Sequence, residues 1–309
     1  MHAARVRASL GSGLVAEFTQ VEQHIPQETV EAARVLAEQK LIEVVVAMGG
    51  GSAMGVGKGV VLVGGRSLIA VPTTYSGSEM TPVFGTTNRA EGRKSVRRDP
   101  TALPKVVIYD PEVTLDLPPQ LTAATAINAL AHCVEACYAH DVNPLVLPVA
   151  LDGIRRIVRS LPLCIANGRD VEAREDLLVG AYLAGFSIAN ATMALHHGVC
   201  HVLGGRTGVA HGVLNTIMLP HVMRFNADAV PDAMTAIANA MGPGRDQSAP
   251  EAVAALVASL PVPQRLRDAG VPEPVLDSVA AEAASNSTVQ ANPKPVSEAG
   301  VRELLRAAW

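Results

Sequence analysis

The chain has 309 residues, of which 49% are hydrophobic and only 3% aromatic, so a large core must be built from Ala, Val, Leu and Ile. A formal net charge of −4, without any block of basic residues, argues against a nucleic-acid-binding protein. No apolar run reaches the roughly 18 residues of a membrane span, and the first residues lack the pattern of a secretory signal. The sequence therefore predicts a cytoplasmic globular protein with neither a nucleic-acid nor a membrane partner.

The four cysteines show no spacing typical of a disulfide framework, and reduced thiols fit a cytoplasmic protein. Cys133 and Cys137 lie one helical turn apart, and we expect them to be packed in the core rather than to bind a metal.

The first part of the chain alternates between helix and strand patterns. Residues 27–40 have an amphipathic helical period, and the β-branched run at 44–48 ends in three glycines, as a buried parallel strand would. A helix follows over 52–63. Further strands are expected at 67–72 and 105–110. Strands separated by helices predict a mostly parallel sheet with helices on its faces.

The pattern changes near residue 119, beyond which no convincing strand pattern appears. Helices are predicted at 120–141, 145–168, 172–190, 192–204 and 229–242. We therefore predict an α/β domain over residues 1–119 and an all-α domain over 120–309. The polar stretch 285–295 reads as a loop, and the basic run 93–98 reads as a solvated turn.

The turn Gly49-Gly50-Gly51-Ser52 leads from a predicted strand into a predicted helix, and Lys58 follows about two turns later. Glycines allow a phosphate to approach the backbone closely, and the N–H groups at a helix N-terminus attract the anion. The pattern is not the GxGxxG fingerprint of the standard dinucleotide fold. A plain tight turn is the alternative interpretation.

The segment Pro72-Thr73-Thr74-Tyr75-Ser76-Gly77-Ser78-Glu79 follows another strand end. Open α/β sheets bind ligands at the carboxyl ends of their strands. Small hydroxyls and a glycine suit a pyrophosphate or a nicotinamide amide. A Ser/Thr-rich cap before the next element would look the same.

Histidines recur at helical spacing in the second half. Asn128 and His132 are four residues apart, as are His197 and His201, and His211 follows ten residues later. Histidines in this register are a frequent way to build a metal site or a proton relay. A lone buried histidine would more often be structural, but several in register favour a functional site.

Taken together, these segments resemble the iron-containing alcohol dehydrogenase family, over roughly residues 15–309. The family pattern is GGGSxxDxxK, PTTxxxxSE, DxxxHxxE, HxxxHxLG and a further His-Gly. This chain matches it at Gly49–Ser52 with Lys58, at Pro72–Thr74 with Ser78-Glu79, at His132 with Glu135, at His197–Gly204 and at His211-Gly212. The resemblance implies a dehydroquinate synthase-like fold, with a Rossmann-like dinucleotide domain, a helical catalytic domain and an active site in the cleft between them.

Two departures from the family pattern indicate which branch of the family the chain resembles. Asn128 stands where the family has an aspartate metal ligand, and Gly55 stands where GGGSxxD has its acid. With the paired His196-His197, they resemble the maleylacetate reductase branch. That branch implies an NADH- or NADPH-dependent reduction of the C=C bond of maleylacetate to 3-oxoadipate during the breakdown of aromatic compounds.

The resemblance also implies roles for individual residues and a dimeric assembly. Predicted catalytic residues are His132, His197, His201, His211 and Asn128, with His197 and His201 as the main hydrogen-bond donors to the developing enolate. Predicted cofactor-binding residues are Gly50, Gly51 and Ser52 at the pyrophosphate, Thr73, Thr74 and Ser78 nearer the nicotinamide, Lys94 near the ribose, and Leu117 at the domain junction. We expect a homodimer and a small dicarboxylate as the substrate.

A metal ion is expected to be absent. Asparagine offers only a neutral carbonyl, whereas a divalent cation favours anionic ligands. Three neutral imidazoles can still hold zinc when water completes the site, in which case His132, His197 and His211 would be the ligands. The lost aspartate therefore favours reduction of a C=C bond over metal-dependent alcohol chemistry.

Three alternatives stay open on the sequence. The family's N-terminal segment, with an FGxG strand and a ribose-binding aspartate, has no match, so the preference for NAD or NADP is unreadable. That gap leaves a truncated, non-catalytic homologue as one alternative. A metal-dependent alcohol dehydrogenase is another, and a related cyclase or glycerol phosphate dehydrogenase is a third, which the PTTYSGSEMTP segment disfavours.

Overall fold

The computed structural model describes residues 2–89, 93–242 and 247–309, and it leaves out the side chains of residues 93 and 94. The chain divides into two compact units, Met1–Asp116 and Leu117–Trp309. The division falls close to residue 119, where the sequence pattern changes.

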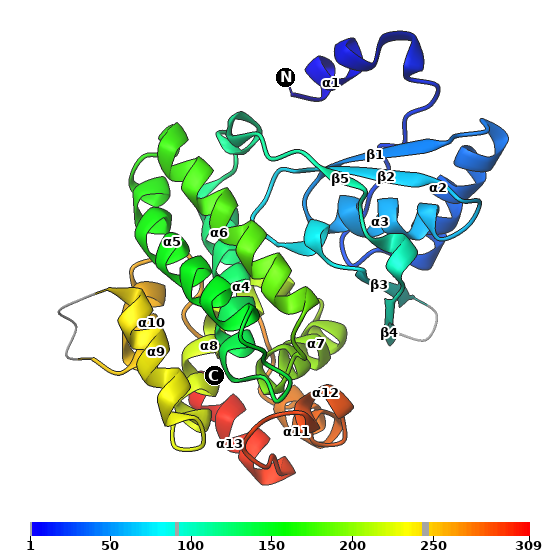
Figure 1. Cartoon of the computed structure of the whole chain (residues 1–309). Helices are drawn as coiled ribbons and strands as arrows, with labels where there is room; N and C mark the ends of the chain where they lie inside the picture. Colours follow the sequence, from blue (N-terminus) through cyan, green and yellow to red (C-terminus); the bar gives the residue numbers. More distant parts are fainter. Residues whose placement is uncertain (1, 90–92, 243–246) are drawn as a thin grey trace. The chain divides into compact units, whose positions relative to one another are not determined.

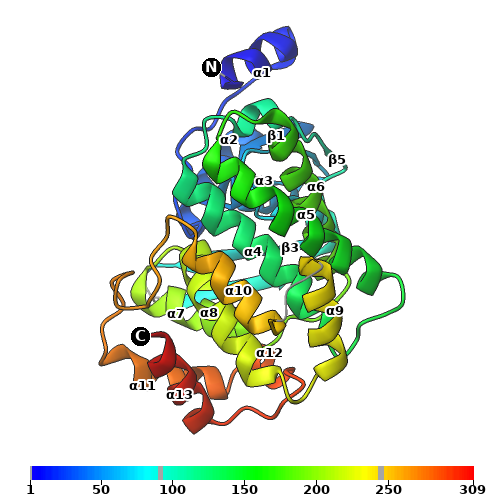
Figure 2. The ribbon, with the colours of Figure 1, turned by 90° about the vertical axis from the view of Figure 1, so that its left-hand side faces the viewer.

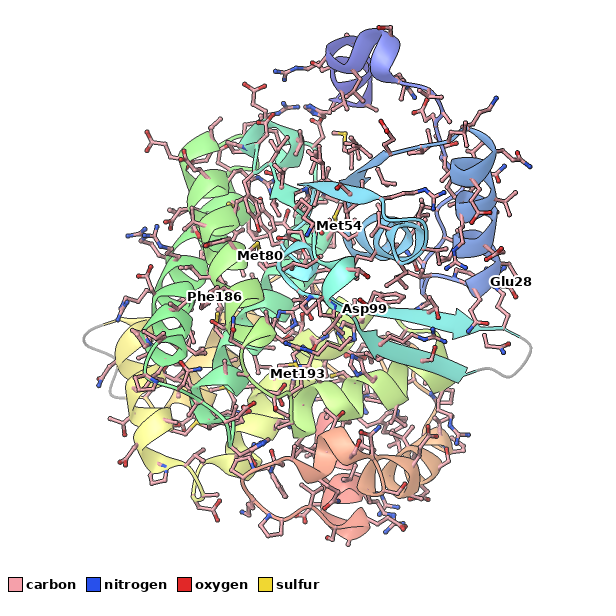
Figure 3. All side chains as sticks on the ribbon, turned by 45° about the vertical axis from the view of Figure 1, so that its right-hand side comes forward. Glu28, Met54, Met80, Asp99, Phe186 and Met193 are labelled. Carbon is pink, nitrogen blue, oxygen red and sulfur yellow. The ribbon has the colours of Figure 1, made fainter. Side chains whose placement is uncertain are left out.

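The first unit is built on a parallel sheet of three strands (Figure 1). These are β1 (Val44–Gly49), β2 (Ser67–Pro72) and β5 (Val106–Val107), and they lie in the order β1-β2-β5. The predicted third strand at 105–110 is thus reduced to two paired residues. Helix α3 (Gly51–Val61) packs on the sheet, and Met54, labelled in Figure 3, is fully buried in the cluster between them.

Helix α2 (Gln27–Gln39) packs against α3 through Val30, Ala33 and Ala37, as its amphipathic period predicts. Glycines on α3 allow this close approach. A Cβ at Gly55 would lie 2.1 Å from Ile25 Cδ1, and one at Gly59 would lie 2.4 Å from Val30 Cγ1. At Gly55, the departure from the family acid, a larger residue would require the Ile25 side chain to move.

The remaining elements of this unit include a hairpin that the sequence did not predict. Strands β3 (Val83–Asn88) and β4 (Arg93–Arg98) pair antiparallel, so the basic run read as a solvated turn is a strand instead. The run was interpreted from its positive charge, and charge alone does not distinguish a solvated turn from an exposed strand. The other short elements are α1 (His2–Leu10), η1 (Gly11–Gly13), η2 (Ser78–Met80), η3 (Pro100–Ala102) and η4 (Pro111–Thr114).

The second unit consists of helices throughout its described residues, as predicted. They are α4 (Pro119–Tyr138), α5 (Val146–Ala166), α6 (Val171–Ala189), α7 (Leu195–Thr207), α8 (His211–Asn226), α9 (Pro231–Met241), α10 (Ala249–Ala258), α11 (Val275–Ala284), α12 (Ser287–Gln290) and α13 (Glu298–Ala308). Helices α8, α10, α11 and α13 are additional to those predicted from the sequence, and α12 forms a single turn inside the predicted loop. Among the described residues, no helix combines the length and apolar character that a membrane crossing needs.

Helix α4 lies at the centre of this unit, in contact with α5, α6, α8 and α9 (Figure 2). Nearly all its residues are buried, which explains its richness in alanine. A second core cluster joins α7, α8, α11 and α13. The four cysteines are free and buried, in agreement with the packing interpretation. Helix α4 also carries buried polar side chains, and such groups are seldom enclosed without a partner or a function.

Candidate active site

The two predicted cofactor segments meet at one edge of the sheet. Gly49 ends β1 and pairs in register with Pro72, which ends β2, and Thr73 donates its backbone N–H to the Gly49 carbonyl at 2.9 Å. The carboxyl ends of parallel strands thus bring the glycine turn beside the threonine segment, in the position where open α/β sheets bind ligands.

The glycine turn leaves the N-terminus of α3 open. Gly50 is the N-cap, no side chain caps the helix, and the first helical hydrogen bond runs from Met54 N–H to the Gly50 carbonyl. The preceding N–H groups therefore have no partner within the helix, and such groups at a helix N-terminus are suited to bind an anion. A Cβ at Gly50 would lie 3.0 Å from Thr74 Cγ2, and Ser76 Oγ lies 3.7 Å from where a Cβ of Gly51 would be. The buried Thr74 hydroxyl has no hydrogen-bond partner among the described residues.

Lys58 does not reach back to this turn, although the sequence places it in the same motif. Its side chain is fully buried, and its ammonium donates to Ser78 O at 2.6 Å, to Thr81 Oγ1 at 3.1 Å and to Val83 O at 2.8 Å. Burial lowers the pKa of Lys58 to about 7, while Glu79 opposes the shift. Lys58 therefore ties the helix behind the glycine turn to the segment that carries Ser78.

The Ser78 segment is held from further elements as well. Tyr109 donates its hydroxyl to Glu79 Oε1 at 2.8 Å, and the hydroxyls of Tyr75 and Thr114 lie 3.2 Å apart. Burial raises the pKa of the Glu79 carboxyl. The predicted cofactor segment is thus a fixed structure, and Ser78 is placed by Lys58.

Two predicted cofactor residues belong to other elements of the chain. Lys94 belongs to β4, where its backbone pairs with Thr87, and its side chain lies outside the described part of the chain. Leu117 is the first residue of the second unit, and its carbonyl accepts from Thr122 and from the buried guanidinium of Arg174. Their contact with a cofactor stays a prediction.

The predicted histidines do converge within the second unit. His132 comes from α4, His197 and His201 from α7, and His211 begins α8. The His197 ring is the hub: its centroid lies 4.7 Å from that of His132, 6.2 Å from that of His201 and 5.8 Å from that of His211. The His201 and His211 rings stack at 5.1 Å. Helical spacing alone could not reveal this convergence of three helices.

Asn128 lies one turn before His132 on α4 and is buried, as the shared face predicts. Both His132 and His197 are also buried. His132 Nδ1 and His197 Nε2 have no hydrogen-bond partner among the described residues. Two buried ring nitrogens without a partner in one cluster are typical of a site that receives a ligand, an ion or water.

Glu135, which was predicted only as part of a motif, contacts both a histidine ring of the cluster and the backbone of α7. Its Oε2 lies 2.5 Å from His197 Nδ1, while its Oε1 accepts backbone N–H groups from Ala194 at 3.2 Å and His196 at 3.0 Å. These N–H groups belong to the N-terminus of α7, where a carboxylate is favoured. The i,i+3 spacing of His132 and Glu135 is the one sequence signal that could have indicated this role.

His196 is a second residue whose function the sequence left open. Its Nε2 lies 3.1 Å from the Asn215 carbonyl on α8, and its Nδ1 lies 3.3 Å from His197 Nδ1. Burial lowers the pKa of His196 to about 4 and that of His197 to about 3, so both rings are neutral at neutral pH. Burial also raises the pKa of Glu135, and the backbone N–H groups oppose that shift.

The expectation of a metal-free site gains no support from the structure. Glu135, His196 and His197 bring ligand-type atoms within 4.8 Å of one another, and the unpartnered His132 Nδ1 and His197 Nε2 are donor atoms that a cation accepts. Imidazole is a usual ligand for zinc and iron, so the residue types fit a divalent cation. The Glu135 carboxylate, however, is already engaged by His197 and by two backbone N–H groups.

Both units match known protein families. Residues 2–111 match the family described as iron-containing alcohol dehydrogenase, and residues 122–309 match the C-terminal part of the Fe-containing alcohol dehydrogenase family. Together these matches cover most of the chain.

Individual relatives point to one branch. The chain is 40% identical to a maleylacetate reductase of Burkholderia cepacia, over 99% of the chain and 85% of the relative, and 38% identical to maleylacetate reductase 1 of Rhodococcus opacus, over 99% and 84%. The crystal structure of maleylacetate reductase from Agrobacterium tumefaciens matches with a TM-score of 0.92 at 34% identity, over 100% of the chain and 86% of that structure. The predicted fold and resemblance are thus confirmed, and the chain belongs to the iron-containing alcohol dehydrogenase family.

Proposed function

We propose that this protein reduces the carbon–carbon double bond of maleylacetate to give 3-oxoadipate, with NADH or NADPH as the hydride donor. The family uses NAD(P), and the curated relatives that share 35–40% identity with the chain over nearly its full length are maleylacetate reductases. The observation that carries the proposal is the convergence of three imidazoles, those of His132, His201 and His211, around the ring of His197 in the helical unit.

The first unit supplies the anion site for the nucleotide. The open N-terminus of α3 would hold the pyrophosphate through the backbone N–H groups of Gly51 and Ser52, and Gly50 leaves room because it has no side chain. Thr73, Thr74 and Ser78 would lie toward the nicotinamide, and Lys58 fixes the segment that carries Ser78.

The chemistry begins with hydride transfer to the alkene carbon that is β to the ketone. The π electrons move onto the ketone oxygen and form an enolate, which hydrogen-bond donors must stabilise. A proton then adds to the α carbon, and oxidised nucleotide and 3-oxoadipate are the products. His201 is the proposed proton source, because its ring is only half-buried and borders both His197 and His211.

A cation in the cluster would be held by His132, His197 and His211, with Asn128 as a neutral neighbour. When bound, it would polarise the ketone oxygen. We propose that turnover does not require it, because Asn128 brings no negative charge and the Glu135 carboxylate is engaged elsewhere. The chain's imidazoles can stabilise the enolate by hydrogen bonding alone.

The test is oxidation of NADH and of NADPH, followed at the nicotinamide absorbance band, with freshly made maleylacetate and with chelator present. We expect turnover that resists the chelator and that falls roughly 10²–10⁴-fold in His201→Gln. The control is His140→Gln, since His140 is exposed in the turn that follows α4 and should tolerate the change. Turnover that appears only after addition of zinc or iron would overturn the metal-independent mechanism.

One observation favours a second candidate. The cluster of Glu135, His196 and His197 offers ligand-type atoms for an ion, and a metal-dependent alcohol dehydrogenase would need one to polarise its alkoxide. Metal-stimulated alcohol oxidation without maleylacetate reduction would establish that candidate. Failure to bind NADH would instead indicate a non-catalytic homologue. The homodimer and the cytoplasmic location stay predictions, and light scattering after gel filtration tests the first.

A further inference from the structure

His197 stands between two groups that each constrain where its single hydrogen can lie. Its Nδ1 faces Glu135 Oε2 at 2.5 Å and His196 Nδ1 at 3.3 Å, whereas its Nε2 is buried with no partner among the described residues. In a neutral imidazole, the hydrogen bond made at one nitrogen decides which form the other takes.

The hydrogen on His196 can be placed first. The Asn215 carbonyl oxygen can only accept a hydrogen bond, so His196 Nε2 carries the hydrogen at this 3.1 Å contact. Neutral His196 then has a bare lone pair on Nδ1, which points at His197 Nδ1. Two bare lone pairs 3.3 Å apart would repel, so this contact favours a hydrogen on His197 Nδ1.

Glu135 leads to the same conclusion by a separate route. Its Oε1 accepts two backbone N–H groups at the N-terminus of α7, and these contacts favour the ionised carboxylate against the burial that raises the pKa of Glu135. An ionised Oε2 can only accept, so the hydrogen of the 2.5 Å contact belongs to His197 Nδ1.

We propose that Glu135 and His196 are positioning residues that lock His197 as the Nδ1–H tautomer, with the Nε2 lone pair facing the histidine cluster. His197 is then an acceptor and donates no hydrogen bond to an enolate oxygen. The proposal departs from the expectation, drawn from the sequence, that His197 is one of the two main donors. That role falls to His201 and to His211, an assignment that rests on the proposed function, whereas the tautomer itself does not.

The backbone contacts make Glu135→Gln an informative variant. The two N–H groups need an acceptor, so the amide oxygen of glutamine must occupy the place of Oε1. Its NH₂ group then takes the place of Oε2 and donates to His197 Nδ1. The substitution preserves shape and sets this contact against the preference that His196 imposes. Because the Glu135 contact is the shorter of the two, 2.5 Å against 3.3 Å, we expect it to prevail and to give the Nε2–H tautomer of His197. Glu79→Gln is the matched control, because Glu79 is equally buried but belongs to the other unit and is bonded to Tyr109.

The experiment is ¹⁵N NMR of the full chain labelled at the histidine rings, after chelator treatment and without substrate, with His197→Gln used to assign the resonance. We expect Nδ1 of His197 to be protonated and Nε2 bare in the wild type and in Glu79→Gln, and the reverse in Glu135→Gln. A wild-type spectrum with hydrogen on Nε2 would overturn the proposal, even if the Glu135 variant fails to fold. An unchanged spectrum in a folded Glu135→Gln protein would overturn it too. Since no substrate is present, absence of reductase activity would not affect either outcome.

Discussion

Replacement of Gly212 by alanine tests whether the close contact of α4 and α8 sets the histidine cluster. A Cβ at Gly212 would lie 2.9 Å from the Ala124 carbonyl oxygen and 3.2 Å from Ala124 Cβ, against 3.4 Å or more in ordinary contact. The obstacle is mainly backbone, which cannot rotate away. The two helices must therefore separate by about 0.5 Å at this point, and His211, the neighbouring residue, moves with α8.

The expected effects follow from that displacement. Overpacking of this kind costs about 1–3 kcal/mol, partly offset by the better helix propensity of alanine, worth up to about 1 kcal/mol. A net loss of about 1–2 kcal/mol should lower the melting temperature by about 2–8 °C. Because a misplacement of about 1 Å can reduce a rate by roughly 10²-fold, we expect kcat to fall by roughly tenfold.

The assays are thermal melting and NADH oxidation with maleylacetate, beside Gly205→Ala as a control. Gly205 lies in α7 with nothing within 4 Å of an added Cβ, so alanine there should leave kcat unchanged and stabilise the helix by up to about 1 kcal/mol. A Gly212→Ala protein with the melting temperature and kcat of the wild type would refute the reasoning.

Three further predictions concern other parts of the chain. Gly50→Ala should weaken NADH binding at least tenfold, measured by fluorescence titration, because its Cβ would press on Thr74 at the open helix N-terminus. Because burial lowers the pKa of Lys58 from 10.5 to about 7, the unfolded chain binds this proton more tightly between those values. Stability should therefore rise with pH across that window, and Lys58→Met should flatten the rise in urea midpoints. Arg174→Leu should lose about 2–4 kcal/mol in urea unfolding, because the guanidinium donates to Thr122 Oγ1 at 2.9 Å inside the helical unit.

Each of these predictions has a built-in comparison. Gly205→Ala should bind NADH like the wild type, and equal affinity in Gly50→Ala would show that the glycine turn does not hold the nucleotide. If the urea midpoints of the wild type and of Lys58→Met changed in parallel with pH, burial would not lower the pKa of Lys58. Arg169→Leu, at an exposed position, should change stability by less than about 0.5 kcal/mol, and a similar value at Arg174 would contradict its structural role.

Much of the fold was readable from local patterns. The period of residues 27–40 gave α2, and the apolar run before the three glycines gave β1, because side-chain periodicity follows directly from backbone geometry. The hairpin of β3 and β4 escaped because strand pairing depends on a partner, and the charges of Arg93–Arg98 resembled a turn. Helix α8 is buried on most sides and encloses polar residues such as Asn215 and Thr216, so its sequence carries little of the one-sided pattern that marks a surface helix.

The sequence by itself determined which residue types are available for chemistry and which family they resemble, because motifs such as His197–Gly204 are written in consecutive residues. Only the tertiary structure decided how they are used. It turned Lys58 away from the glycine turn and onto the Ser78 segment. It also brought Glu135 from α4 and the Asn215 carbonyl from α8 to the paired histidines of α7. The position of a hydrogen on an imidazole depends on atoms within about 3 Å, and those atoms come from helices that are distant in the chain.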